Sequence, residues 1–508
     1  MQNRDVAEML DRAARVLALR GENRYRIRAY KKAAHAVAAL DEDIRNVAAE
    51  DRLQQVAGIG PALAAKIKEI IATGKLALLE RLETSQIPAE INKNILLAAA
   101  LTFSSELVPN LERLPGIQQV QVAGAVRRCQ ETVTGLELVV AVSDIKQAKE
   151  ALSGYPQLHQ LTWKNTVGHA VHSFGVEIAL YLTSEENFTP LLWQITGSEE
   201  HVKKVMAKIK RKTGYDLNSP ESLAKLQIAK EEDIYELADL APIIPELRED
   251  RGEIEAAQSG KLPQVIEAAD YKGDLHVHTN WSDGTASIEQ MVATAAELGY
   301  EYLAITDHSR SLKIARGLSL ERLAKQKKYI ESLQDKYNLR ILTGIEADIL
   351  DDGSVDAPDE ILAELDVVIA SVHSGFRQSQ AKLTERICRA MQNPYVQVIG
   401  HATGRLLGRR DPYDIDLEEV LRVAAATGTA LEINSSPDRL DINDQVARLA
   451  KEAGIAVTIN TDAHSQLELA NIVLGLSVAR RGWLEKKEVL NTYPRQEILA
   501  VLQQKKRR

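Results

Sequence analysis

The chain has 508 residues, 45% of them hydrophobic, which is enough for two to four domains with cores of their own. A net charge of −9 argues against nonspecific binding of nucleic acid by the whole surface, so any such contact must be local. Two cysteines, Cys129 and Cys388, suit a reducing compartment better than a disulfide framework. The charged N-terminus and the lack of a run of about 18 apolar residues argue against a signal peptide and a membrane span, so we expect a cytoplasmic protein.

A basic segment lies near the N-terminus, between two patterns typical of amphipathic helices. Residues 20–32 contain six cations and a single acid, Glu22. The cations are Arg20, Arg24, Arg26, Arg28, Lys31 and Lys32. The apolar positions with helical spacing are Val6, Met9, Leu10, Ala13 and Leu17, then Ala29, Ala33, Ala36 and Leu40.

A glycine-rich turn follows at Gly58-Ile59-Gly60 and leads into a predicted helix over residues 62–73. Such a turn can expose consecutive backbone N–H groups to an anion, although it is also an ordinary way to join two helices. The stretch GIGPALAAKIKEI resembles a helix-hairpin-helix motif. That resemblance implies DNA binding by Gly58, Gly60, Lys66 and Lys68, with the two lysines meeting phosphates.

Residues 5–82 as a whole resemble the N-terminal domain of family X DNA polymerases, and we expect a helical domain over residues 1–84. By this resemblance Lys66 matches the family's deoxyribose-phosphate lyase lysine. A lysine there could form a Schiff base. The alternative is a phosphate-contacting lysine on a solvated helix face.

The middle of the chain, residues 85–249, resembles a shortened nucleotidyltransferase palm and thumb of the same family. The motif begins at Val122-Ala-Gly124-Ala125, where Ala125 stands in place of the family's serine. The family's three metal-binding aspartates correspond here to Gly135, Glu137 and Ala179. The family's second helix-hairpin-helix has no counterpart between Ser85 and Leu114.

Because magnesium requires near-octahedral oxygen ligands, a single glutamate is a poor substitute for three aspartates. Glu177 shares a strand face with Ala179 and is the one conceivable replacement ligand. We therefore expect polymerase activity to be lost. Residues 250–269 are predicted to be a linker, and Lys505 to Arg508 a frayed basic tail.

In the C-terminal part, from residue 270 to residue 508, seven short apolar runs alternate with helix-like segments. This pattern predicts a parallel βα barrel, in which chemistry collects at the carboxyl ends of the strands. Six of the seven runs end in histidines or carboxylates, and Asp283 follows in a loop. A lone histidine at a strand end is usually a rim residue, but this recurrence predicts a polynuclear metal site, with zinc, manganese or iron suiting imidazole.

The motifs DLHVHT, SDG, AITDHS, GIEADIL, SVHS, GHATGRL, EINSSPDRLD and TDAH resemble the PHP (polymerase and histidinol phosphatase) domain of bacterial family X polymerases. This resemblance implies a distorted seven-stranded (βα)7 barrel with nine ligands around three divalent ions, Mn²⁺ or Zn²⁺. Ala402 stands where the family usually has proline. The nine matching positions are His276, His278, Asp283, His308, Glu346, His373, His401, Asp462 and His464.

The resemblance also groups these ligands. His276, His278 and Asp462 would hold one ion with Glu346, which would bridge to a second ion held by His373 and His401. The third ion would take Asp283, His308 and His464. Arg405 and Arg439 follow strand ends and are candidate phosphate contacts, with surface ion pairs as the alternative.

The fold class expected is thus a multidomain α/β protein: a helical N-terminal domain, an α+β palm and thumb, and the barrel. The expected function is metal-dependent 3′–5′ exonuclease or phosphoesterase action in DNA repair, on 3′ ends of gapped or nicked DNA, by a nucleoid-associated monomer. Three alternatives stay open: a phosphate-monoester phosphatase, a working gap-filling DNA polymerase, and a non-enzymatic scaffold for DNA ends.

Overall fold

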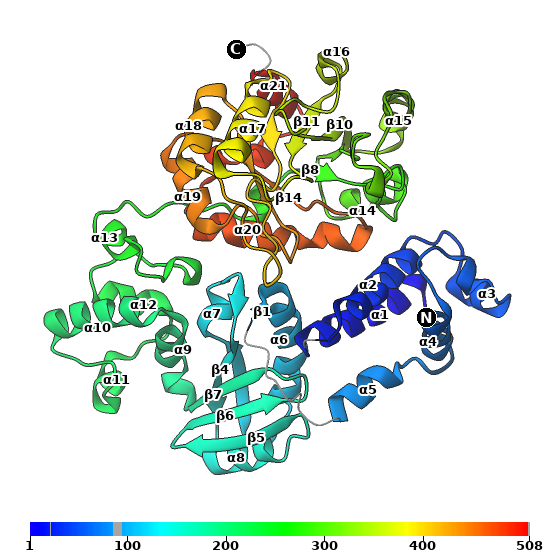
Figure 1. The fold of residues 1–508 in the computed structure, drawn as a ribbon. Helices are drawn as coiled ribbons and strands as arrows, with labels where there is room; N and C mark the ends of the chain where they lie inside the picture. The colour runs from blue at the N-terminus through cyan, green and yellow to red at the C-terminus, as the bar shows by residue number, and fades with distance from the viewer. Residues whose placement is uncertain (21, 85–93, 506–508) are drawn as a thin grey trace. The chain divides into compact units, whose positions relative to one another are not determined.

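A computed structural model describes residues 1–20, 22–84 and 94–505 of the chain (Figure 1). Its contacts divide the chain into two compact units. One comprises residues 1–7, 32–64 and 264–508, and the other comprises residues 8–31 and 65–263. The domain boundaries expected from the sequence stay predictions. Among the described helices, none has the length and hydropathy of a membrane span.

The N-terminal part is helical, as the sequence predicts. The two amphipathic helices and the helix after the glycine-rich turn are confirmed, and the last of them begins at Pro61, a residue favoured in the first helical turn. Gly58 has a φ of +99°, a conformation that glycine adopts most easily. The helices are α1 (Asn3–Leu19), α2 (Arg24–Ala38), α3 (Ile44–Ala49), α4 (Pro61–Thr73) and α5 (Ala77–Thr84).

A five-stranded sheet with the order β2-β4-β7-β6-β5 forms the middle of the chain. Its strands are β2 (Ile117–Val122), β4 (Gly135–Val142), β5 (Leu158–Lys164), β6 (Val167–His172) and β7 (Glu177–Thr183). Strands β4 and β7 are parallel, and the other neighbours are antiparallel. Two short strands, β1 (Ile95–Leu96) and β3 (Thr132–Val133), pair separately. Residues 85–93, where the sequence places part of the shortened segment, lie outside the described residues.

Helices accompany this sheet, and one of them packs on it directly: Phe188 and Leu192 of α9 join Val139 and Ala141 of β4 in a buried cluster. The mixed α+β composition agrees with the predicted palm and thumb class. The helices are α6 (Leu97–Glu112), α7 (Gly124–Arg127), α8 (Ile145–Ser153), α9 (Phe188–Thr196), α10 (Glu199–Thr213), α11 (Pro220–Leu226) and α12 (Glu231–Leu237).

The segment expected to be a linker is packed in its first half. It contains helix α13 (Glu253–Gln258), and Glu253 is fully buried. The carboxylate of Glu253 lies 2.6 Å from Nδ1 of His201, which is also fully buried. A buried carboxylate requires such a partner, so this part of the segment belongs to the fold of the middle region.

Seven parallel strands form the C-terminal barrel predicted from the sequence, in the order β8 to β14 along both chain and sheet. They are β8 (Gly273–Val277), β9 (Tyr302–Ile305), β10 (Arg340–Asp348), β11 (Val367–Ser371), β12 (Val398–Ile399), β13 (Ala430–Asn434) and β14 (Val457–Asn460). The first and last strands approach beyond their carboxyl ends, where the N–H of His278 donates to the carbonyl of Ala463 at 2.8 Å. The barrel is therefore nearly closed.

Helices surround these strands in Figure 1, as a parallel barrel requires. They are α14 (Ile288–Glu297), α15 (Leu320–Leu333), α16 (Asp359–Ala363), α17 (Gln380–Gln392), α18 (Leu417–Thr427), α19 (Asp444–Glu452), α20 (Ile472–Arg481) and α21 (Ile498–Gln503). The last helix, α21, contributes Ile498 and Leu502 to a core that contains Leu275, Tyr302 and Leu342 of the strands.

The expectation of a frayed basic tail is wrong for Lys505. This side chain is buried, and its ammonium donates to the carbonyls of Met391 and Val396 and to the hydroxyl of Thr429. Burial lowers the pKa of Lys505 to about 7. Residues 506–508 lie outside the described residues. A sequence pattern of four cations does not reveal that the first of them returns to the core, because its three oxygen partners are remote in the chain.

We predict that Lys505→Met destabilises the protein by about 1–3 kcal/mol, because three buried oxygens lose their donor while the aliphatic stem is kept. The urea midpoint of the full-length chain measures this. Lys328→Met, at an exposed lysine of the same barrel, is the control and should leave the midpoint unchanged. An equal midpoint for Lys505→Met and Lys328→Met would contradict the prediction.

Candidate metal centre

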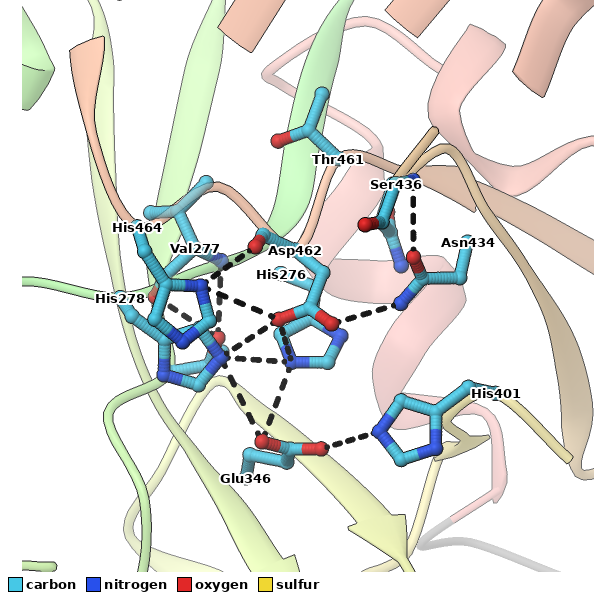
Figure 2. A network of polar contacts seen from close by, with 12 residues as sticks. His276, Val277, His278, Glu346, His401, Asn434, Ser436, Thr461, Asp462 and His464 are labelled. Carbon is cyan, nitrogen blue, oxygen red and sulfur yellow. Dashed lines mark hydrogen bonds and ion pairs between the residues drawn. The ribbon is translucent and has the colours of Figure 1, made fainter. Parts of the chain in front are cut away.

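The nine side chains singled out in the C-terminal part all follow or end barrel strands, or lie in the loop after β8. His276 is in β8, and His278 comes one residue after it. Glu346 is in β10, while His373 and His401 each lie two residues beyond a strand. Figure 2 shows six of the nine converging from these strand ends. They gather at one mouth because the carboxyl ends of parallel strands share one rim.

Glu346 lies at the centre of the cluster and is 1% exposed. Its Oε1 atom is 3.1 Å from Nε2 of His401 and 3.3 Å from Nε2 of His373. Its Oε2 atom is 2.8 Å from Nδ1 of His308 and 3.5 Å from Nε2 of both His276 and His278. One carboxylate therefore faces five imidazoles from the ends of four strands, β8, β9, β11 and β12, and it can bridge more than one cation.

Two further carboxylates complete the arrangement. Asp462 lies 3.0 Å from Nε2 of His278, and Asp283 lies 3.3 Å from Nε2 of His464 and 3.5 Å from Nε2 of His308. Asp462 also has a φ of +53°, a strained conformation for this residue that the surrounding structure must hold in place.

Three groups of side chains in this cluster could each hold a metal ion, because their ligand atoms lie within 4.8 Å of one another. The groups are His278, Asp283, His308 and His464; His276, His278 and Glu346; and His308, Glu346 and His373. Glu346 is common to two groups, in agreement with the bridging role expected of it. His278 and His308 each belong to two groups, whereas the sequence-based grouping assigned each of them to one.

The polar atoms at the centre fit a cation. Among the described residues, Oε2 of Glu346 and Nδ1 of His308 are both buried and lie 2.8 Å apart, yet neither has a hydrogen-bond partner. A buried carboxylate oxygen facing several imidazole nitrogens is costly unless positive charge lies among them. Imidazole and carboxylate donors together suit zinc, manganese and iron.

The pKa values of the cluster histidines also indicate that positive charge is favoured in this cluster. Burial alone would lower the pKa of a histidine, but neighbouring carboxylates raise the pKa of His373, beside Glu346, and of His464, beside Asp283, to about 10. Burial lowers the pKa of His278 to about 4. A ligating imidazole must be neutral, so protons and metal ions compete for the nitrogens of His373 and His464.

A second layer of carboxylates orients the histidines, and sequence reasoning missed it. Glu432 of β13 lies 2.7 Å from Nδ1 of His276, and Asp348 contacts Nδ1 of His373. Each bond fixes the ring so that Nε2 faces the cluster. A signal existed in the sequence: Glu432 lies between Leu431 and Ile433 in a mostly apolar strand, and Asp348 shares a strand face with Glu346. Asn434 adds a 3.0 Å hydrogen bond from its amide to Asp462.

The two arginines proposed as phosphate contacts differ in position. Nε of Arg439 lies 3.9 Å from Oδ2 of Asp462, and its side chain is partly exposed beside the cluster. Arg405 is 8% exposed, and its guanidinium donates to the carbonyl of Leu440. The exposed ion pair considered as the alternative therefore does not describe Arg405.

The altered palm positions lie side by side on two parallel strands. Gly135 pairs with Glu177, and Glu137 pairs with Ala179. A Cβ atom on Gly135 would lie 2.5 Å from the carbonyl oxygen of Glu177, closer than real contacts allow. Glu137 accepts a 3.3 Å hydrogen bond from the N–H of Ala125, and burial raises its pKa.

The hairpin residues are near the start of α4. Gly58 approaches the aliphatic stem of Lys32, whereas the space beside Gly60 is open. Nζ of Lys66 lies 3.5 Å from Oε2 of Glu69, and Lys68 is exposed.

Comparison with known proteins gives matches at both ends of the chain. A family described as "Helix-hairpin-helix domain" matches residues 1–76, and a family described as "PHP domain" matches residues 274–436. The chain is similar to "DNA polymerase/3'-5' exonuclease PolX" of Bacillus subtilis (strain 168), with 33% identity over 99% of each chain.

Other similar proteins match the C-terminal part alone. A probable phosphatase of Thermoanaerobacter sp. (strain X514) is 32% identical over 43% of this chain and 89% of its own length. A probable phosphatase of Vibrio campbellii is 29% identical over 46% of this chain and 92% of its own length.

We predict that Glu432→Gln lowers the metal affinity of the protein by about 10- to 100-fold, because His276 loses the partner that orients its ring. Titration with Zn²⁺ or Mn²⁺ against a chromogenic chelator measures the affinity. Glu418→Gln, at an exposed glutamate on the preceding helix α18, is the matched control. Unchanged affinity in Glu432→Gln would show that its hydrogen bond does not matter for binding.

Proposed function

We propose that this chain, which belongs to the bacterial PolX family, hydrolyses phosphodiester bonds at DNA 3′ ends in its C-terminal barrel. The observation that carries the proposal is the buried Glu346 carboxylate, which faces five imidazoles at the barrel mouth. The similarity to a 3′–5′ exonuclease over 99% of both chains supports DNA as the substrate.

The proposed metal content is three divalent ions, Mn²⁺ or Zn²⁺. Glu346 would bridge two of them, and Asp283 and Asp462 would each serve one. Such ions lower the pKa of water and neutralise charge on a phosphoryl group. The nine ligands would be His276, His278, Asp283, His308, Glu346, His373, His401, Asp462 and His464.

The protein's own groups would position the DNA end. Arg439, beside Asp462, is suited to contact a phosphate oxygen of the substrate, since its side chain is partly exposed there. Arg405 is buried against Leu440, so we assign it the positioning of the loop after β12 rather than the substrate contact considered first. Glu432 and Asp348 would hold His276 and His373 in their ligating orientation.

We propose that the N-terminal hairpin anchors DNA, with Gly58, Gly60, Lys66 and Lys68 at the contact. The family match to a helix-hairpin-helix domain supports this. Phosphate contacts of this kind fix position on DNA without reading sequence. For Lys66 we favour such a contact over lyase chemistry, because its ammonium already lies near Glu69. The boundaries proposed are residues 1–84 for the hairpin domain, 85–249 for the palm and thumb, 250–269 for the connection and 270–508 for the barrel.

Synthesis of DNA is the activity we propose to be lost. An aspartate at position 135 would require the backbone of Glu177 to move, since even a Cβ atom lies 2.5 Å from its carbonyl oxygen. The strand pairing puts the side chains of Glu137 and Ala179 opposite each other, which leaves one carboxylate where a metal pair needs several. The protein would then act as a monomeric nuclease at the nucleoid, on gapped or nicked DNA.

Phosphate-monoester hydrolysis is the second candidate. The probable phosphatases that match 89–92% of their own length to this barrel favour it. Those relatives match only the C-terminal part of this chain, whereas the N-terminal hairpin gives it a reason to bind DNA.

We predict that full-length protein shortens 5′-labelled DNA from its 3′ end with Mn²⁺ or Zn²⁺, and that Asp462→Ala lowers the rate by at least about 100-fold. The variant removes a carboxylate 3.0 Å from His278. Asp335→Ala, at an exposed aspartate, is the control. A small phosphate monoester assayed in parallel separates the two candidate functions. Full activity on DNA in Asp462→Ala would refute the assignment of the site.

A primer-extension assay tests the loss of polymerase activity. With Mg²⁺ and deoxynucleoside triphosphates, we expect no extension of a primer by this protein, because two of the three palm carboxylate positions are Gly135 and Ala179. The Bacillus subtilis relative, assayed identically, is the positive control. Extension that disappears in Glu137→Ala would show that the altered palm still works.

A further inference from the structure

The loop that follows His308 of the candidate metal centre carries an almost fully exposed isoleucine, Ile314. Residues 310–317 form this loop, which we call the 310–317 loop. Ile314 is 93% exposed, the largest exposed fraction of any large hydrophobic side chain among the described residues. Single exposed apolar residues are common on protein surfaces, so exposure alone carries no function. Three features distinguish Ile314: the hydrogen bonds that hold its loop, the cations next to it, and the direct connection of the loop to His308.

The base of the loop is tied to the cluster. The N–H of Leu318 donates to the carbonyl of His308 at 2.8 Å, which closes the loop at a cluster residue. The N–H of Ser309 donates to the carbonyl of Glu346 at 3.0 Å. Ile314 follows His308 by six residues, so the chain places it within about 20 Å of that histidine.

The loop is held by bonds to polar groups on its inner side. The hydroxyl of Ser311 donates to Asp348, the carboxylate that also contacts His373 of the cluster. The N–H of Ser311 donates to Asp356 at 2.7 Å. Gly317 has no room for a side chain, because a Cβ atom there would overlap the carbonyl of Ser309. These contacts present Ile314 on a fixed support.

A second link joins the loop to the segment that precedes Asp283. One guanidinium nitrogen of Arg322 donates to the carbonyl of Arg316 at 2.9 Å, and another donates to the carbonyl of Trp281. Trp281 belongs to the segment between His278 and Asp283. Arg322 therefore fastens the 310–317 loop beside the segment that supplies Asp283 to the cluster.

The exposed part of the loop is basic as well as apolar. It contains Arg310, Lys313 and Arg316 and has no acidic residue. Arg310 pairs with Asp356 at 3.2 Å, while Lys313 and Arg316 are exposed on either side of Ile314. An apolar side chain between two cations suits a nucleic-acid end, whose bases are apolar on their faces and whose backbone is anionic.

We propose that Ile314 is a wedge that separates the terminal base pair of a DNA duplex, so that the last nucleotide of the 3′ strand enters the metal centre. This inference rests on the proposed function. Five of the nine cluster side chains, Glu346 among them, are buried at the barrel mouth, so a terminal nucleotide that is still paired and stacked must first be freed to reach them. Proteins that unstack duplexes insert isoleucine, leucine or phenylalanine between base steps in this way. Lys313 and Arg316 would contact the phosphates that flank the separated pair.

The test compares paired and unpaired 3′ ends with the full-length, metal-loaded protein. We expect Ile314→Ser to lower kcat/KM about tenfold on a duplex with a paired 3′ end, because the unstacking contact is lost. On the same duplex with several mismatched nucleotides at the 3′ end, the loss should be below about twofold, since the end is already open. Hydrolysis of the p-nitrophenyl ester of thymidine 5′-monophosphate should not change.

Two further variants make the comparison specific. Ile314→Leu keeps an apolar side chain and should retain paired-end activity within about twofold. Leu449→Ser removes an exposed apolar side chain from α19, away from the loop in sequence, and should behave as the parent protein. Equal losses on paired and mismatched ends in Ile314→Ser, or none on either, would overturn the wedge. A dimer of the parent protein that Ile314→Ser dissociates would also overturn it, because Ile314 would then serve a protein interface. If the parent protein hydrolyses neither kind of DNA end, the proposed function itself falls.

Discussion

Burial of one carboxylate among imidazoles is the constraint on which the C-terminal barrel depends. Glu346 is 1% exposed and faces five histidines, so its charge must be balanced by cations or protons in the cluster. Burial raises the pKa of such a group, yet His373, His308 and His276 outweigh burial and hold the pKa of Glu346 well below its ordinary value. The same attraction keeps histidines from separate strands at one point, and Glu432 and Asp348 then fix their orientation.

The sequence predicted the barrel, and it pointed to residues at the strand ends, because both are local patterns. A histidine or carboxylate at the end of an apolar run is visible in a short window, and the parallel arrangement brings the run ends together. Glu432 and Asp348 were missed because their function depends on partners across the barrel. Lys505 was misjudged for the same reason: its three oxygen acceptors lie 76 to 114 residues earlier in the chain.

The sheet in the middle of the chain shows how much sequence alone predicts about positions expected to be altered. The resemblance predicts that Gly135, Glu137 and Ala179 stand in place of three aspartates, and the strand pairing puts Glu137 opposite Ala179. What the sequence did not show is how closely these positions are packed. Glu137 accepts a hydrogen bond from Ala125, and a Cβ atom at Gly124 would collide with its carboxylate. Restoring a single aspartate would therefore meet a backbone and a carboxylate that already occupy the space.

The metal chemistry itself does not distinguish a DNA end from a small phosphate ester, since the same ligands would polarise either phosphorus centre. Discrimination must come from groups around the mouth, by contacts that only one substrate can make. The two phosphatase relatives match this barrel alone, whereas a relative that matches 99% of the chain is named "DNA polymerase/3'-5' exonuclease PolX". The loop of residues 310–317 is hydrogen-bonded at its base to His308, and none of its residues belongs to the candidate ligands. Changes in such a loop can therefore alter substrate preference while Glu346 and its histidines stay unchanged.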